Sequence, residues 1–290
     1  METNELIKRV RRLEIKTRGL SRNIFAGQYH SAFKGRGMAF SEVREYQYGD
    51  DIRDIDWNVT ARYNKPFVKV FEEEREMTVM LMVDLSGSRN FGAAGAVKRE
   101  VITEIAATLA FSTIQNNDKI GVILFSDKIE RYIPPQKGSR HVLRIIRELI
   151  DYQPESLGTD LELPLRYVTQ LVRKRCTCFM ISDFICNEPY KDALGIANRK
   201  HDLVAIQVYD PREAELPNVG LVHMVDAETK ASRWIDTAQR STRRAYAEWW
   251  RERQQSMQSA MTSARVDSVS IATDSDYVRS LINLFARRGR

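Results

Sequence analysis

Short apolar runs alternate with longer amphipathic segments from residue 77 to the end of the chain. Runs of about four to eight apolar residues between turn signals predict buried strands. They lie at 77–83, 120–125, 128–133, 177–181, 203–209 and 266–271, and 221–225 with 231–235 form a small hairpin. Helical spacing predicts helices at 94–116, 139–150, 160–174, 189–199, 238–262 and 275–287. Asp274 is the expected N-cap of the last helix, and Pro134-Pro135 the expected end of the strand at 128–133. Strands that alternate with helices predict an α/β domain with a mostly parallel sheet covered on both faces.

The first 75 residues follow a different pattern. Leu6, Val10 and Leu13 recur at helical spacing, which predicts an amphipathic helix over residues 3–18. Periodicity is mixed over residues 24–75, with a turn expected at 48–50 and a strand at 68–71. The sequence therefore predicts an N-terminal extension at 1–75 followed by an α/β domain at 76–290.

Composition narrows the class of protein. No apolar run approaches the ~18 residues of a membrane span, and the first residues lack the apolar core of a signal peptide. Three cysteines, Cys176, Cys178 and Cys186, fit no zinc spacing and are expected to be reduced and mostly buried. These features indicate a cytoplasmic protein with no stable membrane insertion.

The positive charge is concentrated at the ends of the chain. The net charge is +6, but residues 1–45 alone hold ten Lys and Arg against five acidic residues. The rest of the chain is close to neutral, unlike a nucleic-acid-binding domain with a broad basic face. We therefore expect no nucleic-acid partner.

Five oxygen-bearing side chains follow predicted strands or precede a predicted helix. Asp84, Ser86 and Ser88 come directly after the strand at 77–83, Asp183 follows the strand at 177–181, and Thr159 precedes the helix at 160–174. In parallel sheets, ligands bind beyond the carboxyl ends of the strands, so these side chains are expected to meet at one edge. Carboxylates and hydroxyls suit a hard cation, Mg²⁺ or else Mn²⁺ or Ca²⁺. Each residue alone is also an ordinary turn or capping residue.

The three-part pattern resembles the metal-ion-dependent adhesion site of von Willebrand factor A domains. Upstream, the run Tyr46-x-x-Gly49-Asp50-Asp51-x-Arg53-x-Ile55-Asp56-Trp57 resembles the hallmark of a bacterial family called domain of unknown function fifty-eight. The resemblance implies a Rossmann-like von Willebrand factor A fold, with Ser86, Ser88 and Thr159 touching the metal. Asp84 and Asp183 would act directly or through water.

The same resemblance implies a partner, and this sequence departs from the family pattern at one position. Members are commonly encoded beside MoxR-type AAA+ ATPases. Position 184 is Phe, where adhesion-type A domains often have Gly, and the bulky side chain is expected to narrow the site.

The acidic residues of the hallmark segment invite a second metal interpretation. Asp50, Asp51, Asp54 and Asp56 do not match a calcium loop, because the required Gly and Glu positions hold Val59 and Lys65. We expect instead that the acids pair with Arg44, Arg53 or Arg62 and that Trp57 is buried against the α/β domain. A docking surface for the ATPase is the alternative.

Other catalytic patterns are missing from the sequence. The four histidines match no ligand spacing, and the sequence holds neither a P-loop nor a nucleophile elbow. The leading hypothesis is a non-enzymatic, metal-dependent protein–protein interaction module, an adaptor or co-chaperone of a MoxR-type AAA+ ATPase. The alternative is an Mg²⁺-dependent phosphoryl-transfer enzyme with Asp84 as nucleophile, which would need a further acid and a nearby Lys. A membrane-surface adaptor that uses the basic N-terminal helix is a third hypothesis.

Overall fold

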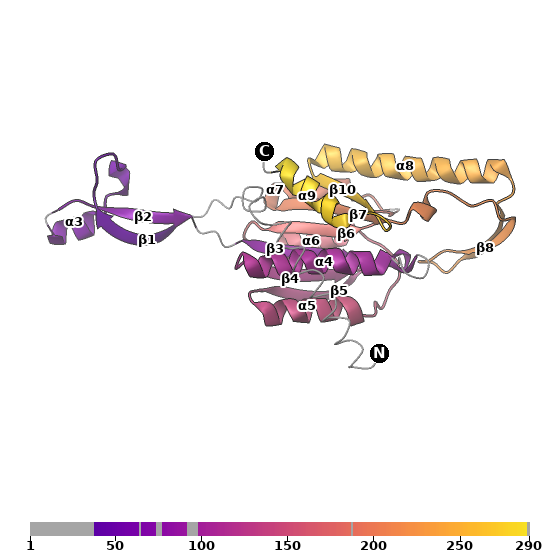
Figure 1. The fold of residues 1–290 in the computed structure, drawn as a ribbon, viewed down its shortest axis with the longest axis horizontal. Helices are drawn as coiled ribbons and strands as arrows, with labels where there is room; N and C mark the ends of the chain where they lie inside the picture. Colours follow the sequence, from indigo (N-terminus) through magenta and orange to yellow (C-terminus); the bar gives the residue numbers. More distant parts are fainter. Residues whose placement is uncertain (1–37, 64, 74–76, 92–97, 187, 289–290) are drawn as a thin grey trace. The chain divides into compact units, whose positions relative to one another are not determined.

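The computed structural model describes residues 38–288, except residues 64, 74–76, 92–97 and 187 (Figure 1). The helix expected over residues 3–18 lies outside the described residues. The described chain forms two compact units, the first ending at Met77 and the second beginning at Thr78.

The smaller unit is an antiparallel pair of strands closed by a helical connection. Strand β1 (Met38–Glu45) pairs with β2 (Phe67–Glu73), which confirms the strand expected at 68–71. A 3₁₀ turn at Ile52–Asp54 and helix α3 (Trp57–Tyr63) connect them.

The acidic residues of the smaller unit serve its local structure. The Arg44 guanidinium donates two hydrogen bonds to the Asp50 carboxylate at 2.8 and 2.7 Å, and the Asp56 carboxylate accepts the amide of Asn58 at the start of α3. The expected pairing of Arg44 with this segment is confirmed. Within the smaller unit Trp57 is 67% exposed, so it is not buried in that unit, and its expected burial against the α/β domain stays a prediction.

A six-stranded sheet forms the centre of the larger unit, in the order β10-β7-β6-β3-β4-β5. All pairings are parallel except that of edge strand β5 with β4. The strands are β3 (Thr78–Asp84), β4 (Lys119–Phe125), β5 (Ile129–Gln136), β6 (Thr177–Ser182), β7 (Asp202–Tyr209) and β10 (Asp267–Ala272). The strands that follow β3 are added outward on one side of it, and those from β6 onward on the other. This order confirms the expected Rossmann-like, von Willebrand factor A-like fold and places the switch point between β3 and β6.

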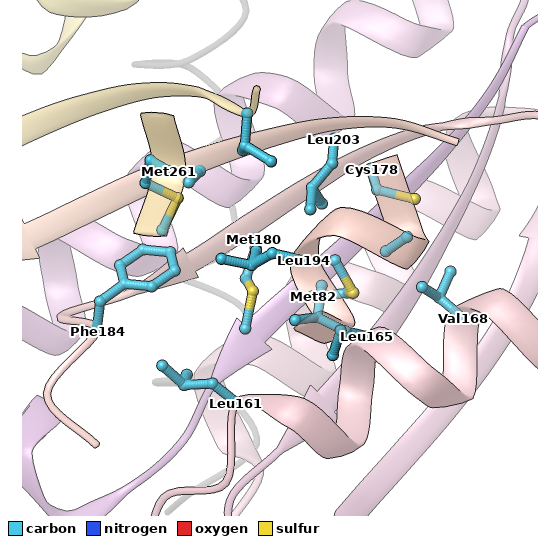
Figure 2. Close-up of a cluster of buried hydrophobic side chains, with 14 of the residues drawn as sticks. Met82, Leu161, Leu165, Val168, Cys178, Met180, Phe184, Leu194, Leu203 and Met261 are labelled. Atoms are coloured by element: carbon cyan, nitrogen blue, oxygen red, sulfur yellow. The ribbon is translucent and has the colours of Figure 1, made fainter. Parts of the chain in front are cut away.

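Helices cover both faces of the sheet (Figure 1). One face carries α4 (Lys98–Gln115), α5 (Ser139–Asp151) and α9 (Tyr277–Arg288). The other carries α6 (Glu162–Leu171), α7 (Lys191–Lys200) and α8 (Arg240–Ala264). Figure 2 shows the packing on this second face, where Met82 and Met180 from the strands lie among Leu165, Leu194 and Met261 from the three helices. These side chains are almost fully buried, and each contributes about 1.5–3 kcal/mol through removal of apolar surface from water.

Two element boundaries differ from the sequence expectation. Strand β5 does not stop at Pro134-Pro135 but continues to Gln136, because an edge strand tolerates residues that cannot donate to a ladder on both sides. The carboxylate that accepts the first amides of α9 belongs to Asp276 and not to Asp274.

A small hairpin, β8 (Leu221–Val225) with β9 (Ser232–Asp236), extends the chain between β7 and α8, as expected. Among the described residues, we find no helix that combines the length and the apolar character needed to cross a membrane.

Candidate metal site at the carboxyl ends of the central strands

Asp84 is the last residue of β3, and its carboxylate ties the two central strands together. Its Oδ1 accepts the Ser86 amide at 2.8 Å, and its Oδ2 accepts the hydroxyl of Ser182, the last residue of β6, at 2.6 Å. The residue is only 3% exposed. Burial, with a contribution from the negative charge of Asp183, raises the pKa of Asp84 to about 6. An ionised Asp84 is therefore a costly group at neutral pH unless a positive charge lies nearby.

Ser86 and Ser88 lie on the loop that leaves β3. Their hydroxyl oxygens are 3.1 Å apart, which places both on the same side of the loop. The amide of Gly87 donates to the carbonyl of Leu157 at 2.9 Å, so the loop is fastened to the segment that contains Thr159. Ser86 is buried, whereas Ser88 is partly exposed.

Thr159 is not the cap of the following helix. The carboxylate that accepts the first amides of α6 belongs to the adjacent Asp160, whose Oδ1 accepts the amides of Glu162 and Leu163 at 2.8 and 3.1 Å. The Thr159 hydroxyl instead donates to Oε1 of Glu228 at 2.5 Å. Capping is therefore not the reason for a hydroxyl at position 159.

Asp183 follows β6, and both of its carboxylate oxygens accept hydrogen bonds. Oδ1 accepts the Ile185 amide at 3.0 Å and so closes a turn. Oδ2 accepts a hydrogen bond from the Lys98 ammonium at 2.8 Å, and the same ammonium donates to Glu213 Oε1 at 2.7 Å. The Lys98 side chain is 1% exposed. Burial alone lowers its pKa, but the two carboxylates outweigh burial, and the pKa of Lys98 is raised.

Phe184 does not occupy the site. Its backbone has φ of 58°, a left-handed conformation that glycine adopts more readily than residues with a side chain. The side chain is 5% exposed and packs in the hydrophobic cluster of Figure 2, near Tyr190. Contrary to the sequence expectation, the ring turns into the core beneath α6–α8.

All five predicted residues thus lie together at the switch point, with three residues that sequence reasoning missed. Lys98, Glu213 and Glu228 are separated from their site partners by 85, 115 and 69 positions in the chain. Lys98 is an ordinary charged residue in a predicted helix, and Glu228 an ordinary turn residue. Their sequence context carried no signal.

The donor set fits a hard divalent cation. Burial raises the pKa of both Asp84 and Glu228, the charge of Asp183 adds to both shifts, and the charge of Asp84 adds to that of Glu228. The Lys98 ammonium is already shared by Asp183 and Glu213. Hydroxyls and carboxylates in such an arrangement are the ligands that Mg²⁺ prefers.

A separate cluster of soft donors lies at the opposite end of β6. Cys176, Cys178 and His201 are buried, with the two sulfurs 3.5 Å apart and Cys176 Sγ 3.3 Å from His201 Nδ1. Neighbouring Cys178 and His201 lower the pKa of Cys176 to about 6, although burial opposes the shift. The three cysteines are free thiols, and Cys176 and Cys178 are buried, as expected. Because Cys176 precedes β6 and Asp183 follows it, this cluster takes no part in the candidate metal site.

Comparison with known proteins identifies relatives along most of the chain. The family model described as "Protein of unknown function DUF58" matches residues 42–256. The uncharacterized protein Rv1480 of Mycobacterium tuberculosis is 28% identical over 290 residues, which cover 99% of this chain and 90% of that protein. The uncharacterized protein YeaD of Bacillus subtilis is 27% identical over 122 residues, 42% of this chain and 27% of that protein.

Solved structures similar to this chain include an aerotolerance-related membrane protein from Bacteroides fragilis, with 15% identity and a TM-score of 0.49. The match covers 73% of this chain and 98% of that one. The VWA domain of SpRpn10 has 10% identity and a TM-score of 0.41, over 72% of this chain and 94% of that one.

Proposed function

The chain belongs to the DUF58 family of proteins of unknown function, and from this premise we propose that it is a protein-interaction module that binds its partner through a divalent cation. The observation that supports the proposal is the convergence of Asp84, Ser86, Ser88, Thr159 and Asp183. They come from three separate segments of the chain, the end of β3 with its following loop, the segment before α6 and the loop after β6, and they meet at the switch point between β3 and β6. Turn-forming residues with purely local roles would have no reason to converge there.

Each residue of the site would contribute differently to the cation. Ser86, Ser88 and Thr159 would bind the cation through neutral hydroxyls, and the carboxylate of the buried Asp84 would supply negative charge. One oxygen of Asp183 is already paired with the Lys98 ammonium. This pairing favours contact between the Asp183 carboxylate and the cation through water rather than directly. When bound, the cation supplies positive charge that neutral hydroxyls do not cancel. That charge would attract an Asp or Glu of a partner.

We propose a MoxR-type AAA+ ATPase, or a client shared with it, as that partner, with the chain as adaptor or co-chaperone. The support is the resemblance of the hallmark segment and the nature of the site. The experiment is to measure binding to a MoxR-type AAA+ ATPase from the same organism, in Mg²⁺ and in excess chelator. We expect binding in Mg²⁺ and its loss in chelator.

Equal binding in Mg²⁺ and chelator would contradict the metal-dependent mechanism. The smaller unit would then be the docking surface to test, because it exposes several large apolar side chains. These are Tyr48, Ile52, Trp57 and Tyr63.

The geometry favours binding over phosphoryl transfer. Both oxygens of Asp84 accept internal hydrogen bonds and the residue is 3% exposed, so it is a poorly placed nucleophile. Lys98 is engaged by two carboxylates rather than open to a phosphate.

We therefore expect the purified protein, supplied with Mg²⁺, to leave ATP and simple phosphate esters intact. Phosphate release is the measurement. Hydrolysis that survives rigorous purification and disappears in Asp84→Asn would favour the enzyme instead.

A further inference from the structure

The turn of the β8–β9 hairpin lies directly on the loop of the candidate metal site. A Cβ added to Gly87, between Ser86 and Ser88, would lie 2.3 Å from the carbonyl oxygen of Ala227 in that turn. Real Cβ atoms do not approach an oxygen so closely, so only glycine allows this contact. The turn therefore packs against the backbone of the proposed metal-binding loop.

The same turn carries a carboxylate to the site. Glu228 follows Ala227, and its Oε1 accepts the Thr159 hydroxyl at 2.5 Å. Its side chain is partly buried, and burial together with the charges of Asp183 and Asp84 raises its pKa. A free carboxylate at the edge of a domain would normally turn toward water and away from two other acids. Glu228 does the opposite.

The turn is built to hold Glu228 in this position. The Asp226 carboxylate accepts the amides of Glu228 and Thr229 at 2.9 and 2.8 Å, and the Asp226 amide donates to Ala231 at 2.8 Å. These bonds fix the backbone on both sides of Glu228, which leaves little conformational entropy to lose when its side chain binds. Away from the turn, the hairpin is open, with Leu221, Val225 and Trp234 all more than half exposed.

We propose that Glu228 is a metal ligand supplied by the chain itself, in the coordination position that a partner's acidic residue would otherwise fill. The inference rests on the proposed metal site. It makes the hairpin tip a built-in competitor of the partner. A partner must therefore displace Glu228 from the cation, and the hairpin tip must move away from Gly87 when it does.

The test uses Mn²⁺ as the metal and counts the water molecules bound to it by water-proton relaxation. Wild type is compared with Glu228→Ala and Glu228→Gln. Glu215→Ala is the matched control, because Glu215 is an exposed acid outside the site. Since Glu228 lies on a surface turn, its replacement should leave the fold intact, which circular dichroism checks.

In Glu228→Ala we expect one more metal-bound water and an Mn²⁺ affinity about tenfold weaker. This is the lower end of the loss in metal affinity seen when a group that supports a metal site is removed. Glu228→Gln should weaken Mn²⁺ binding in the same direction. Sodium acetate, as a carboxylate probe, should displace the bound water at a roughly tenfold lower concentration in Glu228→Ala than in wild type, with sodium chloride as the salt control. Glu215→Ala should behave as wild type.

The two ways to fail are distinct. If wild type binds Mn²⁺ but Glu228→Ala has the same water number and the same acetate response, Glu228 is not a ligand, and the proposed metal site stands without it. If wild type binds no Mn²⁺, the proposed site and this inference both fall.

Discussion

Replacement of Lys98 by methionine should lower the free energy of unfolding by about 3–5 kcal/mol, the usual cost of removing one partner from a buried ion pair. The Lys98 ammonium lies between Asp183 and Glu213 at 2.8 and 2.7 Å, with its side chain 1% exposed. Methionine fills a similar volume but leaves two buried carboxylates without their counter-charge. The measurement is chemical denaturation in the presence of chelator.

Mg²⁺ gives this prediction a second part. Without Lys98 the site is more negative, so saturating Mg²⁺ should stabilise Lys98→Met more than it stabilises wild type. Lys191→Met is the matched control, because Lys191 is an exposed residue of α7. If Lys98→Met lowers the free energy of unfolding by less than about 1 kcal/mol, the ion pair contributes little to stability. The two buried carboxylates would then not need the Lys98 charge.

Joint replacement of Ser86 and Ser88 by alanine should weaken Mg²⁺-dependent binding to the ATPase about 100-fold. Removal of even the outer-shell partners of a metal site weakens metal affinity or activity by roughly 10–100-fold. These hydroxyls are the proposed direct ligands. The fold should survive, because both hydroxyls lie on the loop that leaves β3 and hydrogen-bond to each other. Calorimetric affinity in Mg²⁺ is the measurement.

Exposed serines on α8 supply the control for that variant. Ser259→Ala with Ser263→Ala removes two hydroxyls of the same kind far along the chain from the site. The control should bind as wild type. Equal affinities for both double variants would show that the partner does not use the candidate site.

The arrangement of the sheet could be predicted because its information is local. Each strand of the sheet is a short apolar run, and alternation with amphipathic helices dictates a parallel sheet with two covered faces. Placement of Asp84 and Asp183 at the ends of β3 and β6 follows from the same pattern. Their meeting at one edge required only the general rule for ligand sites in such sheets.

The remainder of the site depends on contacts that no local pattern encodes. Lys98 reaches Asp183 across 85 positions, and Glu228 reaches Thr159 across 69. The direction of a side chain is equally absent from the sequence pattern: residue 184 adopts φ of 58°, and the Phe184 ring packs in the core. The end of β5 was misjudged because the sequence does not show that this strand is an edge strand.

If a divalent cation binds on Asp84 and its neighbours, it should stabilise the folded chain, and the effect should depend on Asp84. The most direct measurement is the melting temperature of wild type and Asp84→Asn, each in chelator and in Mg²⁺ at ten times the dissociation constant. At that concentration binding stabilises the fold by about 1.4 kcal/mol, which shifts melting by roughly 2–4 °C or less in a chain of this size.

Wild type should show that shift. Asp84→Asn should show none, and in chelator it should be at least as stable as wild type, because it relieves the repulsion between Asp84 and Asp183. The same Mg²⁺ response in both proteins would place the cation elsewhere and rule out a site built on Asp84.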